Sequence, residues 1–200
     1  ANKPRMVGDD ATSPNMPPFM ATWPPPPVDM PHRVAAAPEA SSGLGLQALF
    51  RASQAGWSIY LLGNEDQVAR GQMEYELWER FEADLLSHLE RQGVRVVRSY
   101  SCTDDPVNGV KGHRKESVFR LPNTGPMYHA KQFEGVELKS SWVIGDDSIE
   151  LAAGWRAGCL SAGILGAREH VAGTLETDTA FVAEDLTDAL QAITTAVRAA

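Results

Sequence analysis

Two kinds of hydrophobic pattern alternate along this chain. Some apolar residues form short continuous runs, and others recur every three or four positions, as they do every four residues from Leu77 to Leu89. The short runs predict strands at residues 5–8, 57–62, 94–100, 142–144, 161–165 and 181–183. The periodic segments predict helices at residues 44–54, 73–92, 127–133 and 186–197, with a further small-residue helix that ends at Trp155. Strands that alternate with helices imply an α/β fold, with a parallel sheet covered by helices on both faces.

One long segment, residues 13–38, interrupts this pattern and holds most of the prolines of the chain. Proline fixes φ and removes an amide donor, so we expect a loop or an extended arm here rather than a helix or a central strand. Two interpretations of this arm stay open. It is a tethered surface loop, or it is a lid on the substrate side, as the apolar Phe19, Met20 and Trp23 suggest.

Length and charge narrow the class of protein. The 200 residues fit a single domain, residues 1–200, and a net charge of −8 argues against binding to nucleic acid or to an anionic membrane. No apolar run approaches the ~18 residues of a membrane span. Two cysteines, Cys102 and Cys159, do not form a disulfide framework, so we expect a reducing cytoplasm.

The strongest chemical signal lies at residues 142–150. The apolar run predicted as a strand leads directly into Asp146 and Asp147, with Glu150 close behind, and a small-residue helix follows. Ligands of open α/β sheets bind at the carboxyl ends of the strands. Carboxylate oxygens gathered there are the ligands that Mg²⁺ prefers, so the pattern indicates a magnesium site.

This segment resembles the fourth motif of the haloacid dehalogenase (HAD) superfamily. The chain as a whole is most similar to the branch that contains the histidinol-phosphate and D-glycero-D-manno-heptose-1,7-bisphosphate phosphatases. The resemblance implies a three-layer α/β/α sandwich with a Rossmann-like parallel sheet and no large cap domain. It also implies Mg²⁺ as cofactor, with Asp146, Asp10 and Glu150 at the metal positions.

The first motif of this branch ends a strand with Asp-Arg-Asp-Gly-Thr. Its first Asp attacks phosphorus, and its second exchanges protons with the leaving group and with water. The best match in this chain is Gly8-Asp9-Asp10-Ala11-Thr12. The resemblance then gives Asp10 and Thr12 the catalytic positions, while Gly8 stands at the nucleophile position and cannot attack phosphorus. Asp9 as a replacement points to the opposite side of an extended strand.

The second and third motifs are similarly altered. Asn64 and Arg70 match the second motif, but Gly63 replaces the hydroxyl residue that grips the phosphoryl group. Arg120 matches the third motif, but Leu121 replaces its lysine, a loss that typically costs ~10²–10³ in rate. The resemblance makes Asn64, Arg70 and Arg120 the substrate-binding residues.

Two acidic residues of the second motif argue against phosphate binding. Glu65 and Asp66 stand where the family has neutral side chains, and they place negative charge beside any phosphate.

Many members of this branch hold a structural zinc ion with a Cys-x-His and a Cys-x-Cys pair. Cys102 matches the first ligand, Asp104 stands at the histidine position, and the cysteine pair is missing from the sequence. His113 is too isolated to complete four ligands. We therefore expect no zinc site.

Two functions fit these residues. The first is a degenerate phosphatase scaffold, not an active enzyme, that binds a protein partner or a small phosphorylated ligand; we expect the proline-rich arm to carry this binding. The second is a Mg²⁺-dependent phosphatase of the heptose-bisphosphate or histidinol-phosphate type with impaired chemistry. Replacement of three reactive positions (Gly8, Gly63 and Leu121) favours the first. Weak Mg²⁺ binding is expected in either case, because one carboxylate ligand is missing.

Overall fold

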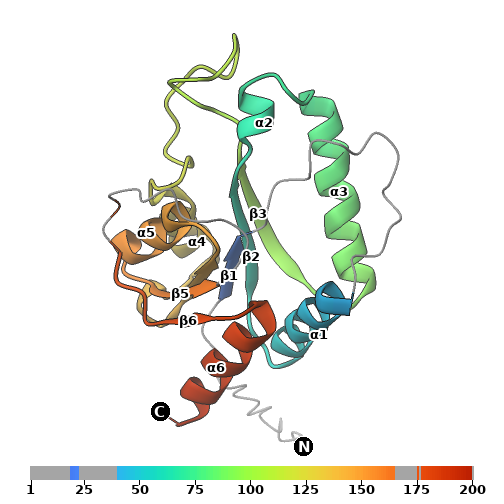
Figure 1. Ribbon diagram of the computed structural model, residues 1–200, viewed down its shortest axis with the longest axis vertical. Helices are drawn as coiled ribbons and strands as arrows, with labels where there is room; N and C mark the ends of the chain where they lie inside the picture. The colour runs from blue at the N-terminus through green and yellow to red at the C-terminus, as the bar shows by residue number, and fades with distance from the viewer. Residues whose placement is uncertain (1–18, 23–39, 165–174, 176, 200) are drawn as a thin grey trace, which may run out of the picture.

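Six parallel strands form one sheet in the order β3-β2-β1-β4-β5-β6 (Figure 1). The computed structural model describes residues 19–22, 40–164, 175 and 177–199. The strands are β1 (Phe19–Thr22), β2 (Ile59–Asn64), β3 (Val96–Cys102), β4 (Trp142–Gly145), β5 (Leu160–Ile164) and β6 (Phe181–Ala183). The chain crosses from one side of β1 to the other between β3 and β4, which makes β1 the centre of the sheet.

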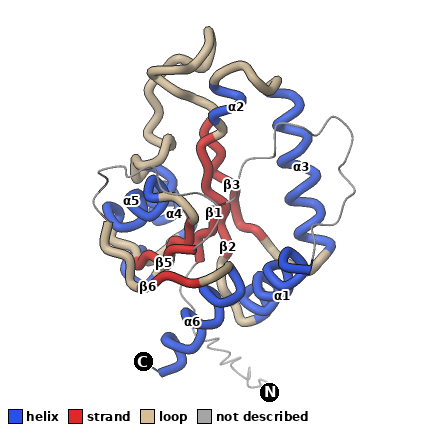
Figure 2. The backbone as a smooth tube through the Cα atoms, in the orientation of Figure 1, coloured by secondary structure: helices blue, strands red, loops and turns tan. Residues whose placement is uncertain are grey.

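Helices cover both faces of this sheet, as the sequence predicts (Figure 2). They are α1 (Ala40–Gln54), α2 (Asp66–Ala69), α3 (Tyr75–Arg91), α4 (Gly125–Glu134), α5 (Ser148–Ala157) and α6 (Leu186–Ala199), with a 3₁₀ turn η1 at Leu138–Ser140. Residues of α1, α3 and α6 share one buried cluster, and residues of α4 and α5 share the other. The architecture is a three-layer α/β/α sandwich.

Strand β2 shows how the sequence divides its side chains between these two clusters. Ile59 and Leu61 pack with α1, α3 and α6, while Tyr60 and Leu62 pack with α4 and α5. Successive side chains of a strand point to opposite faces, and a strand covered on both faces is a continuous apolar run. The short apolar runs at β2 and β4 are therefore buried throughout, apart from the last two residues of β2.

The central strand corrects the sequence analysis. The strand between β2 and β4 is Phe19–Thr22, inside the segment 13–38 that was assigned to a loop or arm, and not the run at residues 5–8 that matches the first motif. That assignment is wrong for these four residues. They form the proline-free stretch between Pro18 and Pro24, so all four amides are available for the sheet. Residues 6–8 and the rest of the proline-rich segment lie outside the described residues.

The other predicted elements are confirmed to within a few residues, and the loop between β3 and α4 has no helix or strand. The one-turn helix α2 was missed because four residues are too few to show a period. Asp185 caps the C-terminal helix, since its Oδ1 accepts a hydrogen bond from the Asp188 amide at 2.9 Å. In the described part of the chain, no helix is long and apolar enough to cross a membrane.

Gly154 sets the distance between α5 and the sheet. A Cβ at this position would lie 2.7 Å from Cβ and Cγ2 of Val143 on β4. We predict that Gly154→Ala lowers the free energy of unfolding by about 1–3 kcal/mol, because the helix must move away from the sheet.

The matched control is Gly45→Ala on α1, where the nearest atom to the new Cβ is 3.8 Å away. This variant gains helix propensity, so its free energy of unfolding rises by up to ~1 kcal/mol. Urea denaturation of both variants checks the pair; equal effects at the two positions would contradict the close packing of α5.

Candidate functional site

The carboxyl edge of the sheet brings predicted site residues to both sides of β1. Ala21 lies opposite Leu61 of β2 and Ile144 of β4, so the two neighbouring strands end at nearly the same level. Asn64 is the last residue of β2, and Asp146 directly follows β4. These two predicted residues therefore lie at one edge, as expected. Gly8, Asp10 and Thr12 lie outside the described residues.

The end of β1 changes the assignment of the first motif. The strand ends at Thr22, and the sequence continues with Trp23 and the four prolines 24–27. The first carboxylate after the strand is Asp29. The residues that follow the central strand thus contain neither of the two carboxylates of the phosphatase motif, and the match at residues 8–12 does not coincide with this strand.

Asn64 uses both ends of its side-chain amide to hold the loop between β3 and α4. Its Nδ2 donates to the Leu121 carbonyl at 2.8 Å, and its Oδ1 accepts from the Leu121 amide at 2.9 Å. This pair of hydrogen bonds joins positions 57 residues apart in the chain. The predicted substrate-binding residue Asn64 is therefore engaged by the protein itself.

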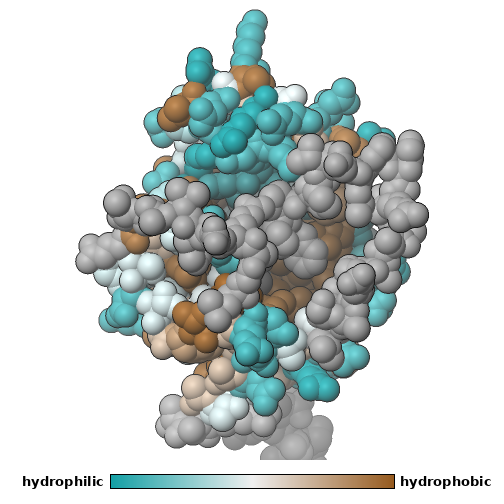
Figure 3. Space-filling view, in the orientation of Figure 1, coloured by the Kyte–Doolittle hydropathy of each residue, from teal (hydrophilic) through white to brown (hydrophobic). Residues whose placement is uncertain are grey.

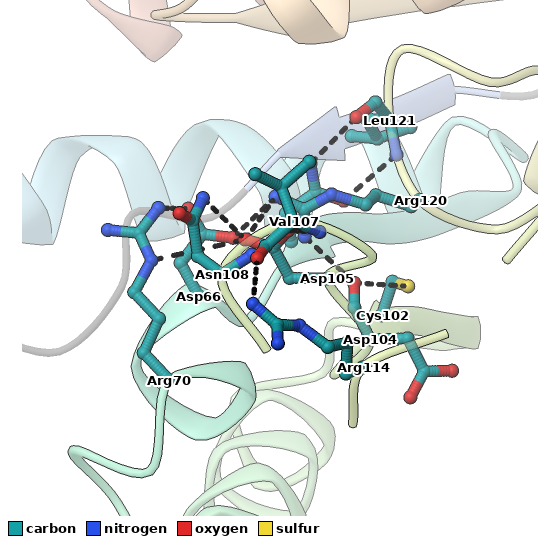
Figure 4. A network of polar contacts seen from close by, with 11 residues as sticks. Asp66, Arg70, Cys102, Asp104, Asp105, Val107, Asn108, Arg114, Arg120 and Leu121 are labelled. Atoms are coloured by element: carbon teal, nitrogen blue, oxygen red, sulfur yellow. Dashed lines mark hydrogen bonds and ion pairs between the residues drawn. The ribbon is translucent and has the colours of Figure 1, made fainter. Parts of the chain in front are cut away.

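Arg70 and Arg120 converge on one carboxylate (Figure 4). The Arg70 Nη2 atom lies 2.8 Å from Oδ2 of Asp66, and the Arg120 Nη2 atom lies 2.9 Å from Oδ1 of the same residue. Arg120 also contacts Asp105 Oδ2 at 3.3 Å and donates from Nη1 to the Asp104 carbonyl at 2.9 Å. Both predicted cations are compensated by acidic side chains. Asp66, which we expected to repel a phosphate, is instead the partner of the two arginines.

Asp105 organises this network, and the sequence analysis missed it. Its side chain is 2% exposed, and its Oδ1 accepts hydrogen bonds from the amides of Val107 at 2.9 Å and Asn108 at 3.0 Å. The hydrogen bond from the Asn108 amide is the main reason why the pKa of Asp105 lies below its ordinary value; the bond from Val107 and the charge of Arg120 act in the same direction. The signal was present in the sequence, since Asp-Pro-Val-Asn is a typical Asx-turn pattern.

Leu121 lies in the core rather than at the edge. It is 3% exposed and belongs to the cluster formed by α4, α5 and one face of the sheet, with Met127 and Val143. The position that carries a lysine in the resembling phosphatases is thus part of the apolar packing here.

Asp146 is the predicted site residue that stays available. Within the described ranges its half-buried carboxylate has no hydrogen bond or ion pair. Its neighbours differ: Asp147 caps α5 by accepting from the Ile149 amide at 3.1 Å, and Glu150 Oε2 accepts from the Asp147 amide at 3.0 Å. Glu150, a predicted metal ligand, therefore completes a capping box.

Glu65 has the most perturbed carboxyl group near this edge. Burial, and to a smaller extent the neighbouring carboxylates of Glu82 and Asp66, raise its pKa to about 7. Figure 3 shows that polar side chains gather over the end of the molecule that holds α2 and the loop between β3 and α4. Glu65 directly precedes α2 and is buried, with only 8% of its area exposed.

The residues at the zinc-loop position form a different set of contacts. Cys102 is buried, and its Sγ lies 3.8 Å from the Asp104 carbonyl oxygen. Asp104 Oδ1 lies 3.5 Å from Lys115 Nζ and 3.8 Å from His113 Nδ1, so a lysine supplies positive charge to this carboxylate. Nowhere in the described ranges do three or more His, Cys, Asp or Glu side chains gather as a metal site.

The fold is shared with solved structures, among them a putative HAD-like phosphatase from Mesorhizobium loti (TM-score 0.66, 21% identity, covering 94% of this chain and 91% of that one). Two others are D,D-heptose 1,7-bisphosphate phosphatase from B. bronchiseptica complexed with magnesium and phosphate (TM-score 0.69, 22% identity, covering 90% of this chain and 99% of that one), and the enzyme of that name from Burkholderia thailandensis (TM-score 0.58, 16% identity, 90% and 99%). The predicted fold class is therefore confirmed.

Sequence relatives point to the same branch. The D-glycero-β-D-manno-heptose-1,7-bisphosphate 7-phosphatase of Pseudomonas aeruginosa is 28% identical over 114 residues, which cover 57% of this chain and 60% of that protein. A D-glycero-α-D-manno-heptose-1,7-bisphosphate 7-phosphatase of Photorhabdus laumondii is 26% identical over 103 residues, 52% and 56% of the two chains. The chain thus spans less than two thirds of the length of these curated relatives. No family model matches it.

The raised pKa of Glu65 predicts a pH-dependent stability. Between the ordinary value of 4.5 and about 7, the folded protein keeps a proton that the unfolded chain releases. The free energy of unfolding therefore falls as the pH rises through this window, by at most about 3 kcal/mol from this group, and Glu65→Gln removes that part of the slope.

Urea denaturation from pH 4.5 to 8, with a chelator present, measures this effect. The control is Glu116→Gln, which changes an exposed carboxyl group in the loop. A slope that is the same in the wild type and in Glu65→Gln would show that Glu65 has no raised pKa.

Proposed function

We propose that this chain is a HAD-phosphatase-like protein that binds a small phosphorylated ligand, of the sugar-phosphate class, or a protein partner, and does not hydrolyse phosphate esters. One observation carries the proposal: no carboxylate follows the central strand β1 before Asp29. Phosphoryl transfer to an aspartate needs an attacking oxygen at the end of this strand, and Thr22, Trp23 and the prolines offer no carboxylate for it.

The remaining charges at the edge support the same conclusion. Arg70 and Arg120 are neutralised by Asp66 and Asp105, so they are not free to stabilise charge that develops on a phosphoryl group. Leu121 supplies no cation. Binding without hydrolysis does not require free guanidinium groups, because a ligand phosphate can compete with Asp66 for those of Arg70 and Arg120.

Magnesium fits only part of this site. Asp146 has a free carboxylate and would hold the ion, whose role would be to neutralise phosphate oxygens. Glu150 is committed to the capping box, and Asp10 and Thr12 lie outside the described residues. A single carboxylate with main-chain oxygens implies weak Mg²⁺ binding.

A second function has its own support. The relatives and the solved structures are named as heptose-bisphosphate phosphatases, and these names favour a Mg²⁺-dependent phosphatase over a binding module. Asn64, Arg70, Arg120 and Asp146 match that family and lie on both sides of β1. In this alternative the substrate is a small phosphorylated metabolite, and an oxygen nucleophile comes from another part of the chain.

Hydrolysis assays decide between the two functions. We expect no turnover of p-nitrophenyl phosphate or of sugar bisphosphates with Mg²⁺, and an unchanged background in Asp146→Asn. A kcat within the usual enzyme range of ~1–10³ s⁻¹ that is lost in Asp146→Asn would contradict the proposal and establish the phosphatase.

Restoring the lysine of the third motif is expected to damage the fold. Leu121→Lys places an ammonium group in the apolar cluster around Met127, at a cost of several kcal/mol in the free energy of unfolding. Leu121→Met keeps the volume and costs less than ~1.5 kcal/mol. Thermal denaturation compares the two variants. A Leu121→Lys protein as stable as the wild type, with measurable phosphatase activity, would show that this position still faces the site.

A further inference from the structure

An open depression lies between the loop that precedes α4 and the last turn of α5. Its volume is about 620 Å³, within the ~300–1,000 Å³ of typical small-ligand sites. The two helices contact each other over one face of the sheet (Figures 1 and 2), and Arg156 of α5 lines the depression. The other lining residues lie between Val118 and Tyr128. Asp146 is not among them, so this depression is distinct from the candidate site at the carboxyl edge.

Arg156 is the cation of this depression. Within the described residues no carboxylate pairs with its guanidinium group, and the lining of the depression contains no Asp or Glu. The carboxyl edge differs, because Asp66 holds both Arg70 and Arg120 there. A phosphate that binds at Arg156 therefore displaces no carboxylate. A guanidinium group also donates to two phosphate oxygens at once, which fixes the orientation of the anion.

Two polar side chains of the loop line the same depression. Thr124 is the N-cap of α4, yet its hydroxyl makes no capping hydrogen bond, so it can donate to a ligand oxygen. Asn123 Nδ2 donates to the Ser117 carbonyl at 3.0 Å. This bond orients the Asn123 side chain, and its Oδ1 can accept a hydrogen bond from a ligand hydroxyl.

The main chain at the start of α4 contributes little to anion binding. The Gly125 amide donates to the Val118 carbonyl at 3.1 Å, and Pro126 has no amide hydrogen. The helix dipole favours an anion at this end, but the hydrogen bonds to it must come from side chains. The depression thus depends on Arg156 rather than on the helix end alone.

An apolar wall completes the depression. Tyr128 is 51% exposed and Val118 is 66% exposed, and both line it together with Pro122. An exposed aromatic ring offers a flat apolar surface to the carbon skeleton of a ligand, whereas inorganic phosphate alone makes no use of it. An apolar wall with a few polar groups that fix orientation is typical of small-ligand sites.

We propose that this depression binds a phosphate monoester of a small polar molecule, of the sugar-phosphate class. Arg156 pairs with the phosphate oxygens, and the Thr124 hydroxyl donates to one of them. The Tyr128 ring packs against the carbon skeleton, and Asn123 accepts from a hydroxyl group of the ligand. The inference rests on the proposed function, because it gives the phosphorylated ligand of that proposal a site that needs neither Asp146 nor Mg²⁺.

NMR titration of the ¹⁵N-labelled protein with glucose 6-phosphate, in the presence of a chelator, tests the proposal. We expect saturable shifts of the Thr124 and Tyr128 amides, and affinity at least tenfold weaker in Arg156→Gln. Arg51→Gln removes the same charge from an exposed position of α1 and leaves the affinity unchanged. Tyr128→Ala weakens the binding of glucose 6-phosphate but not that of inorganic phosphate. Since Arg156 and Tyr128 are both exposed, their variants keep the melting temperature of the wild type.

Two outcomes would overturn the proposal. Binding that survives in Arg156→Gln and is lost in Arg70→Gln would place the ligand at the carboxyl edge, and the proposed function would still hold. The absence of saturable shifts with glucose 6-phosphate, phenyl phosphate and inorganic phosphate at millimolar concentrations would show that the depression binds no phosphate. Turnover of the ester that requires Asp146 would instead contradict the proposed function, while an effect of Arg156→Gln on affinity would still support this site.

Discussion

The paired hydrogen bonds between the Asn64 side chain and the main chain of Leu121 determine how the carboxyl edge is built. They fix the loop that precedes α4 against the end of β2, and Leu121 itself enters the apolar cluster below. Since the amide of Asn64 satisfies one donor and one acceptor of a buried main chain, its loss would leave both unpaired. This structural role accounts for the asparagine at position 64.

The same loop brings Arg120 and Asp105 beside α2, where Asp66 and Arg70 lie one helical turn apart. Two guanidinium groups and two carboxylates then form a neutral network (Figure 4). In an active phosphatase, free positive charge at this edge binds the anionic ligand and its transition state. Here much of that charge is used to close the loop, and any anionic ligand has to displace Asp66. The network gives residues that match a phosphatase motif a structural role of their own.

Much of the fold could be predicted from the sequence, because β2 and β4 are continuous apolar runs and α3 has a clear four-residue repeat. The central strand could not be predicted, because its four residues lie between prolines and are too few to show a pattern. The better match to a family motif at residues 8–12 placed the first strand there instead. Asp146 was predicted from its position after β4. The partners of Asn64 and Arg120 were not predictable, because they depend on how a loop without periodicity folds back. Asp105 was not predicted, although the sequence Asp-Pro-Val-Asn around it is a typical Asx-turn pattern.

We propose that no aspartate at the end of β1 accepts a phosphoryl group. Beryllium trifluoride forms a stable mimic of an aspartyl phosphate when Mg²⁺ and a nucleophilic aspartate are present together, and ¹⁹F NMR detects the bound form directly. We expect only the signals of free fluoride species in the presence of the protein and Mg²⁺. A protein-bound signal that requires Mg²⁺ and disappears in Asp146→Asn would contradict it.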